Sequence, residues 1–175
     1  MGAEERMGIA VGLTVGLAVG LLFVALLFRK KVLDCTFDER QERARGVAFK
    51  YGFFTLMGSI FLYGASELAV GRWCDALTGG CLCLAAGILV FAVICILKDA
   101  YLSLLERPRR IMTLFVLLSL VNLGLGALMA AHGKLVEDGV LTFRAVNLVM
   151  GIMTLVILIV YIVNFLLRSR ETEEE

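Results

Sequence analysis

The residues with the greatest chemical potential in this chain are a few polar side chains within or beside long apolar stretches. Glu67 is the one charged residue inside those stretches, and a carboxyl group in a membrane is costly unless it meets water or a partner. It can act as a wetted carboxylate near the outer surface, within reach of Arg72, or as a site residue. Asn122 lies near the middle of its stretch, where an amide usually bonds another helix. The candidate polar site comprises Glu67, Asn122, His132 and Asn147.

No residue pattern typical of a catalytic centre accompanies these side chains. The sequence contains one histidine. It has no Gly-rich phosphate loop with its lysine, no His-Glu-x-x-His motif and no Gly-x-Ser-x-Gly motif. Cys81 and Cys83, even with His132, do not have the spacing of a standard zinc site. We therefore predict a protein that is not an enzyme and that holds no metal or cofactor.

The composition is that of an integral membrane protein. Of the 175 residues, 60% are hydrophobic and 19% are charged, the mean hydropathy is +0.90 and the net charge is +1. These values exclude a disordered chain and give no indication of a nucleic-acid partner. We expect an all-α, polytopic membrane protein, a single domain over residues 1–175. Its five predicted transmembrane helices are Gly8–Phe28, Tyr51–Val70, Leu77–Leu97, Ile111–Ala131 and Ala145–Leu167.

The distribution of basic residues predicts the orientation. Segments 29–50, 98–110 and 168–175 contain 13 Lys and Arg residues, whereas the alternating segments contain 4. The positive-inside rule then places the N-terminus outside and the C-terminus in the cytoplasm of the plasma membrane, with the first helix retained. Cys74, Cys81 and Cys83 lie near the outer surface, where a Cys74–Cys81 disulfide is geometrically possible. The sequence leaves the paired and the free states open, and Cys35, on the cytoplasmic side, is expected to be reduced.

The segment between the first two predicted spans is the most distinctive stretch. Thr36 and Glu39 have the spacing of a capping box. We expect a short helix along the cytoplasmic membrane surface that turns near Gly46 into the second span. Its basic residues form a candidate surface for a partner or for lipid, namely Arg40, Arg43, Arg45 and Lys50.

The same segment carries a family resemblance. The run Phe37-Asp38-Glu39-Arg40-Gln41, followed by Arg45-Gly46 and Lys50-Tyr51, resembles a group of small uncharacterised polytopic membrane proteins of Gram-positive bacteria. The resemblance covers roughly residues 35–60. It implies a bacterial plasma membrane, and it implies no activity.

The first predicted span contains a repeated glycine pattern. A four-residue spacing places these glycines on one helix face, which a partner backbone can approach closely. The partner can be another helix of this chain, a second copy or another subunit. We expect an accessory or regulatory membrane protein that acts through helix–helix association. The alternative is a small transporter or channel with a polar path between spans 2, 4 and 5. The glycines are Gly8, Gly12, Gly16 and Gly20.

Overall fold

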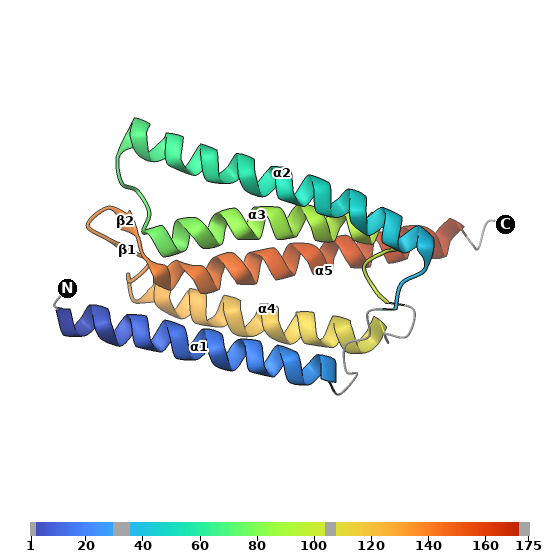
Figure 1. Ribbon diagram of the computed structural model, residues 1–175, viewed down its shortest axis with the longest axis horizontal. Coiled ribbons are helices and arrows are strands. Elements are labelled where there is room, and N and C mark those ends of the chain that lie inside the picture. Colours follow the sequence, from blue (N-terminus) through green and yellow to red (C-terminus); the bar gives the residue numbers. More distant parts are fainter. Residues whose placement is uncertain (1–2, 30–35, 104–107, 172–175) are drawn as a thin grey trace. The chain divides into compact units, whose positions relative to one another are not determined.

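The computed structural model describes residues 3–29, 36–103 and 108–171, and these residues are mostly helical. The described residues form five α-helices and a short β-hairpin, and Figure 1 shows how these elements follow one another along the chain. The chain divides into two compact units, one that contains α1 and one that contains all the other elements. The elements are α1 (Ala3–Arg29), α2 (Glu39–Val70), α3 (Ala76–Leu97), α4 (Pro108–Ala131), β1 (Val136–Glu137), β2 (Val140–Leu141), the 3-10 helix η1 (Phe143–Ala145) and α5 (Val146–Glu171).

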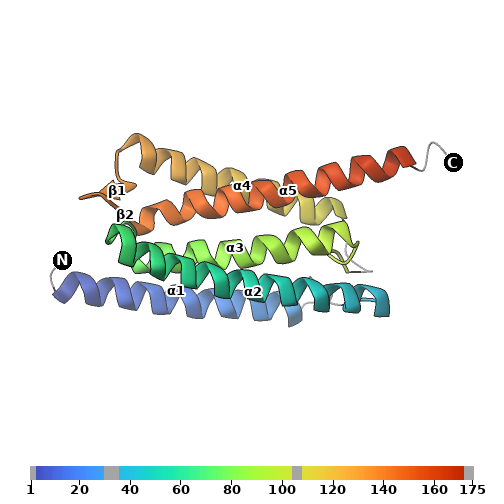
Figure 2. The same cartoon turned by 90° about the horizontal axis from the view of Figure 1, so that it is seen from above.

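The four helices of the second unit pack in the order α2–α3–α5–α4. Close contacts join α2 to α3, α3 to α5, and α5 to α4, and Figures 1 and 2 show α3 between α2 and α5. A buried cluster of Ala92, Ile96 and Ile157 joins α3 to α5. Each of the four helices is long and apolar enough to cross a membrane. The count of five spans and the orientation stay predictions.

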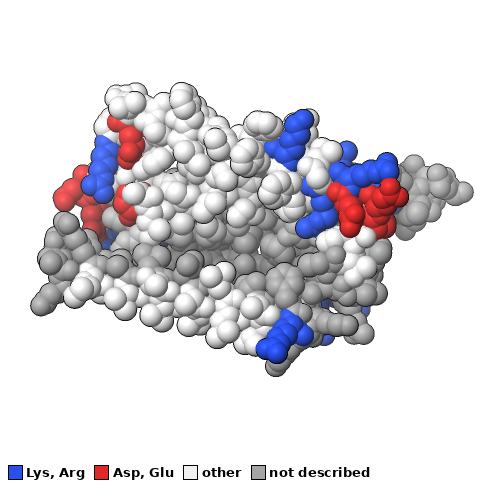
Figure 3. Space-filling model, in the orientation of Figure 1, with Lys and Arg blue, Asp and Glu red and all other residues white. Residues whose placement is uncertain are grey.

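Charged side chains mark the two ends of this unit. In Figure 3, Lys, Arg, Asp and Glu gather at both ends, and uncharged surface lies between them. We call one end the basic end, where α2 and α4 begin and α3 and α5 finish. The other is the hairpin end, where β1 and β2 lie. This distribution suits a bilayer, whose hydrocarbon core excludes charged groups.

The predicted surface helix is wrong as a separate element. α2 runs from Glu39 to Val70 without a break at Gly46. Its 32 residues span about 48 Å at roughly 1.5 Å per residue, longer than a hydrocarbon core of about 30 Å. The juxtamembrane segment is therefore the first part of the second long helix.

The predicted capping box is also misplaced. The N-cap is Asp38, whose carboxylate accepts a hydrogen bond from the Gln41 amide at 2.6 Å, and the Gln41 side chain accepts one from the Asp38 amide at 3.3 Å. Both Thr36 and Asp38 are suitable caps by residue type. The choice of Asp38 brings Gln41 to the third helical position, where its side chain completes the box.

The hairpin departs from an all-α fold. β1 pairs antiparallel with β2, and the two turn residues Asp138 and Gly139 both have positive φ, 52° and 77°. Asp-Gly is a preferred pair for such a tight turn because both positions need the left-handed region. Leu141 also bonds to the loop before α3, donating to Trp73 O at 2.8 Å and accepting from Asp75 N at 2.9 Å. The loops before α3 and α5 are thus joined at the hairpin end.

Glycines set the close approach of the paired helices. A Cβ added at Gly52 of α2 would lie 3.0 Å from Gly87 O of α3. One added at Gly126 of α4 would lie 2.9 Å from Leu148 Cα of α5, and one at Gly151 of α5 would lie 2.8 Å from Leu123 N of α4. The absence of a side chain lets both helix pairs gain dispersion contact, which lipid alone does not provide.

Replacing Gly126 by Ala should destabilise the α4–α5 pair. The new methyl group would overlap the backbone of Leu148, and overpacking of this kind costs about 1–3 kcal/mol. We expect a lower apparent melting temperature in mild detergent, measured by circular dichroism.

Gly124→Ala is the matched control, two residues away on the same helix. Nothing lies within 4 Å of a Cβ built there, and Ala favours a helix over Gly by about 0.5–1 kcal/mol. The control should hold or raise the melting temperature. Equal losses in the two variants would contradict the close approach at Gly126.

Candidate functional site

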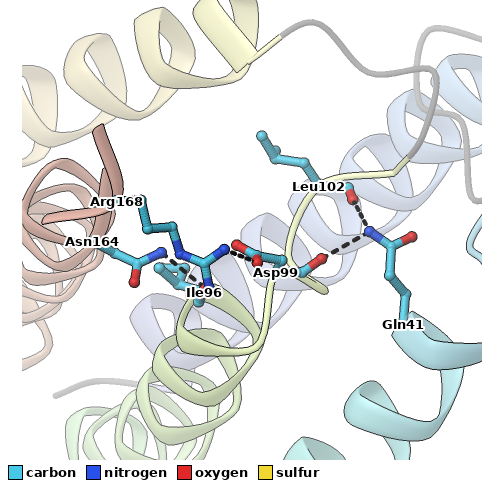
Figure 4. A network of polar contacts seen from close by, with 6 residues as sticks. All are labelled: Gln41, Ile96, Asp99, Leu102, Asn164 and Arg168. Carbon is cyan, nitrogen blue, oxygen red and sulfur yellow. Dashed lines mark hydrogen bonds and ion pairs between the residues drawn. The ribbon is translucent and has the colours of Figure 1, made fainter. Parts of the chain in front are cut away.

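A buried glutamine connects α2 to the loop after α3 at the basic end. Gln41 is 7% exposed, and its side-chain amide donates hydrogen bonds to Asp99 O at 2.8 Å and Leu102 O at 3.3 Å (Figure 4). Its side-chain oxygen completes the capping box of α2. One side chain therefore satisfies the start of one helix and two carbonyl groups of a loop about 60 residues away.

Arg45 reinforces this junction one turn further along α2. Its guanidinium donates to Ala100 O at 3.1 Å and lies 4.0 Å from the centre of the Phe37 ring. The Phe91 ring of α3 is 5.5 Å from the same guanidinium. A cation between two aromatic faces gains electrostatic attraction while its hydrocarbon stem packs. Arg45 thus packs against the end of α3 and the rings of Phe37 and Phe91. Its part in a surface for a partner or for lipid stays a prediction.

Asp99 ends α3 in a conformation that usually belongs to glycine. Its φ is 52°, and its amide donates to Ile96 O at 3.2 Å while the Ala100 amide donates to Cys95 O at 2.8 Å. This pair of bonds is a Schellman motif, which provides hydrogen-bond donors for carbonyl groups of the last helical turn. An aspartate tolerates the left-handed region better than most residues. It also offers a carboxylate that glycine lacks.

That carboxylate forms an ion pair with Arg168 near the end of α5 (Figure 4). On the preceding turn of α5, the Asn164 amide donates to Ile96 O at 3.2 Å. Both contacts attach α5 to the end of α3. Gln41, Asp99, Asn164 and Arg168 also line a pocket of about 220 Å³ that continues to the aromatic rings of Tyr101, Tyr161 and Phe165.

The remaining predicted basic residues stay on the surface. Arg40, Arg43 and Lys50 are exposed, and Arg43 pairs with Glu39 at 2.6 Å, one helical turn away. Exposed pairs of this kind contribute little to stability. Arg40 and Arg43 line a second pocket with residues of α3 and α5. Lys50 is not among the residues of that pocket.

Glu67 occupies a polar corner at the hairpin end. It accepts a hydrogen bond from Tyr63 Oη at 2.9 Å on its own helix. The Tyr63 ring packs against Gly79 of α3, where an added Cβ would lie 2.3 Å from the ring. Trp73 lies 5.8 Å from Tyr63, ring centre to ring centre, and its indole donates to Ser66 Oγ at 2.8 Å. Glu67 is therefore held by a tyrosine, and Arg72 is exposed beside this corner.

The other members of the candidate polar site do not join Glu67. The Asn122 amide donates to Leu118 O at 2.8 Å, and the His132 ring lies 2.7 Å from Leu128 O, both within α4 or its end. Asn147 is half-buried at the start of α5. Among the described residues, no hydrogen bond joins any two of these four. The interhelical bond expected of Asn122 is instead made by Ser119, which donates to Gly151 O at 3.2 Å.

The cysteines of the described segments are free thiols. Cys74, Cys81, Cys83 and Cys95 are unpaired in the structure, while Cys35 lies outside the described residues. Cys74 is fully buried beside Leu141 of the hairpin. Burial raises the pKa of the Cys74 thiol, and the neighbouring Asp75 carboxylate raises it further. In the part of the chain that the structure describes, no three His, Cys, Asp or Glu residues are placed to hold a metal ion.

Comparison with protein-family models, curated proteins and solved structures finds no match to this chain. The resemblance of the juxtamembrane motif to membrane proteins of Gram-positive bacteria thus stays a prediction. The structure does give that motif a physical role. Asp38 caps α2, Gln41 and Arg45 hold the loop after α3, and Phe37 covers the Arg45 guanidinium.

Sequence reasoning assigned no contact to Gln41, Asp99 or Asn164. Their partners on other elements are 58 to 69 residues away along the chain, so no local pattern identifies them. The sequence does contain a signal for the hairpin, because Asp138-Gly139 lies between two short apolar runs and Asp-Gly is a preferred hairpin turn. The arrangement at the basic end offers hydrogen-bond donors and cationic groups, which are groups that can bind anions.

Replacing Gln41 by Glu should destabilise the basic end. The carboxylate keeps the shape of the side chain but loses the two donors to Asp99 O and Leu102 O. Leaving such groups unpaired costs about 1–3 kcal/mol each. We expect a lower melting temperature and faster amide hydrogen exchange over residues 99–102, measured by mass spectrometry. The control Glu42→Gln changes an exposed neighbour and should leave the melting temperature and the exchange rate unchanged. If amide exchange is unchanged in Gln41→Glu, Gln41 does not hold the loop after α3.

The Cys74 thiol should react slowly with N-ethylmaleimide in the folded protein. A raised pKa means that less thiolate is present at a given pH, and the thiolate is the nucleophile. Labelling should increase only as the pH rises above the ordinary thiol pKa, and it should become rapid after denaturation in SDS. Peptide mapping by mass spectrometry would measure it. Rapid labelling at pH 7 in the native state would show that the hairpin does not cover Cys74.

Proposed function

We propose that this protein is a non-enzymatic component of a membrane that acts by helix–helix association, in an accessory or regulatory role. One observation carries the proposal: α1 falls in a different compact unit from α2–α5. The α2–α5 unit also makes close glycine contacts among its own helices. The α2–α5 unit therefore packs through small residues of its own, and the glycines of α1 offer the same kind of close-approach face to a partner helix.

The proposal uses the glycine face of α1, defined by Gly8, Gly12, Gly16 and Gly20. Their spacing puts them on one side of an α-helix that runs from Ala3 to Arg29. A helix of 27 residues is long enough to serve as a fifth span, since about 20 residues suffice. The partner is a second copy or another membrane protein, because close backbone approach rewards any complementary helix.

We further propose a bacterial plasma membrane with the basic end in the cytoplasm. The bias of Lys and Arg between alternating loops supports this orientation. It accords with the direction of α2 to α5, which brings the basic residues of 37–50, 98–102 and 168–171 to one end of the unit.

The helix order disfavours the transport alternative. A polar path between spans 2, 4 and 5 needs Glu67 and Asn122 to face one space, but α3 lies between α2 and α5. Glu67 and Asn122 also hydrogen-bond within their own helices. We therefore favour association over transport.

Replacing Gly12 and Gly16 by Leu should weaken association through α1. Two leucine side chains would fill the groove and keep a partner backbone at a distance. We expect a smaller oligomer or loss of co-purifying protein in mild detergent, measured by size-exclusion chromatography with light scattering and by mass spectrometry.

Ala10→Leu with Thr14→Leu is the matched control. These positions have the same spacing but lie on the opposite side of an α-helix. The control should retain the oligomer and its partners. The association proposal fails if the glycine variant and the control behave alike.

A further inference from the structure

The basic end contains a second pocket whose polar lining is entirely cationic. It has a volume of about 350 Å³ and lies where α2 begins and where α3 and α5 finish. Small-ligand sites are commonly about 300–1,000 Å³. Figure 3 shows Lys and Arg gathered at this end of the unit, with Asp and Glu beside them. The pocket is lined by Arg40, Arg43, Ala44, Val47, Leu97, Lys98 and Arg168.

Two of the four cations have acidic partners. Arg43 pairs with Glu39 and Arg168 pairs with Asp99. For Arg40 and Lys98 the described residues show no ion pair, and both side chains are exposed. The Arg43–Glu39 pair is itself highly exposed, at 78% and 81%, so an incoming anion exchanges with it at little cost. The six charged groups sum to a surplus of positive charge that an anion can neutralise.

The cations are held near one another by the contacts already described. Gln41 and Arg45 attach the start of α2 to the loop that follows Lys98. Asp99 and Asn164 attach the end of α5 to the end of α3. The three backbones that carry the basic side chains are therefore connected before any ligand arrives. A connected frame reduces the ordering cost of binding.

The apolar part of the pocket shows which anion fits. Ala44, Val47 and Leu97 complete the lining, and Val47 and Leu97 are 42% and 56% exposed. These residues lie at the end of helices that are long and apolar enough to cross a membrane. An occupant with a phosphate head and hydrocarbon chains satisfies both parts of the lining, whereas free phosphate satisfies only the cations.

We propose that this pocket, formed by Arg40, Arg43, Lys98 and Arg168, binds the phosphate headgroup of one anionic phospholipid. Basic pockets between transmembrane helices on the cytoplasmic side are suited to such headgroups. The guanidinium groups provide paired donors for phosphate oxygens, and Lys98 provides a compact point charge. The bound lipid bridges α2, α3 and α5 at the membrane surface.

The test is a titration of the delipidated protein with phosphatidylglycerol in detergent, followed by native mass spectrometry of the intact chain. The Arg40→Gln, Lys98→Gln double variant should bind the first lipid roughly 30-fold more weakly, since each basic residue at a membrane surface contributes about a factor of five. The Arg109→Gln, Arg110→Gln double variant removes the same charge from the same end but outside the pocket. It should change the affinity less than about threefold.

Further measurements distinguish an anionic phospholipid from free phosphate as the ligand. Phosphatidylcholine should bind far more weakly than phosphatidylglycerol, and millimolar inorganic phosphate should not displace the lipid. The Arg40→Lys variant, which keeps the charge but loses the paired donors, should weaken binding less than Arg40→Gln does. Circular dichroism should show unchanged helicity in every variant. Equal weakening in both double variants would reduce the site to diffuse attraction and overturn the proposal. Displacement by inorganic phosphate, or equal binding of phosphatidylcholine, would overturn it as well.

Discussion

Backbone carbonyl groups at the basic end need hydrogen-bond donors, and α2 supplies them. Lipid offers no donors, so the polar backbone of a membrane protein must be satisfied within the protein or by interfacial water. The loop after α3 presents the carbonyls of Asp99, Ala100 and Leu102, which accept bonds from Gln41 and Arg45. The Schellman bonds of Asp99 and Ala100 close the turn before them. The position of α2 beside α3 depends on this match.

At the hairpin end, backbone N–H groups provide the donors that the carbonyl groups need. Leu141 exchanges hydrogen bonds with Trp73 and Asp75, so the loop before α3 gains a short bridge to β2. α4 ends in a second Schellman motif, in which Gly133 takes the left-handed position with φ 66°. A glycine suffices there. At the end of α3, Asp99 takes the same position and adds the carboxylate that pairs with Arg168.

Sequence patterns locate the apolar helices well because hydrophobic length is a local property. Predicted Leu77–Leu97 compares with α3 at Ala76–Leu97, and predicted Ile111–Ala131 with α4 at Pro108–Ala131. The role of a glycine is not local in this way. Gly126 and Gly151 are close-contact residues only because Leu148 and Leu123 of the facing helix lie against them. The glycines of α1 repeat every four residues, which makes them easy to recognise in the sequence. The glycines that make close contacts within α2–α5 have no such repeat.

Asp99 makes two contacts at the basic end through two different groups. Its backbone carbonyl accepts from Gln41, and its carboxylate pairs with Arg168. A ligand that takes Arg168 away from the carboxylate leaves the carbonyl bond in place, and Arg45 still holds Ala100. The junction of α2 with α3 therefore does not depend on the state of the surface ion pairs. The exposed cations can exchange partners while the junction of α2 with α3 keeps its hydrogen bonds.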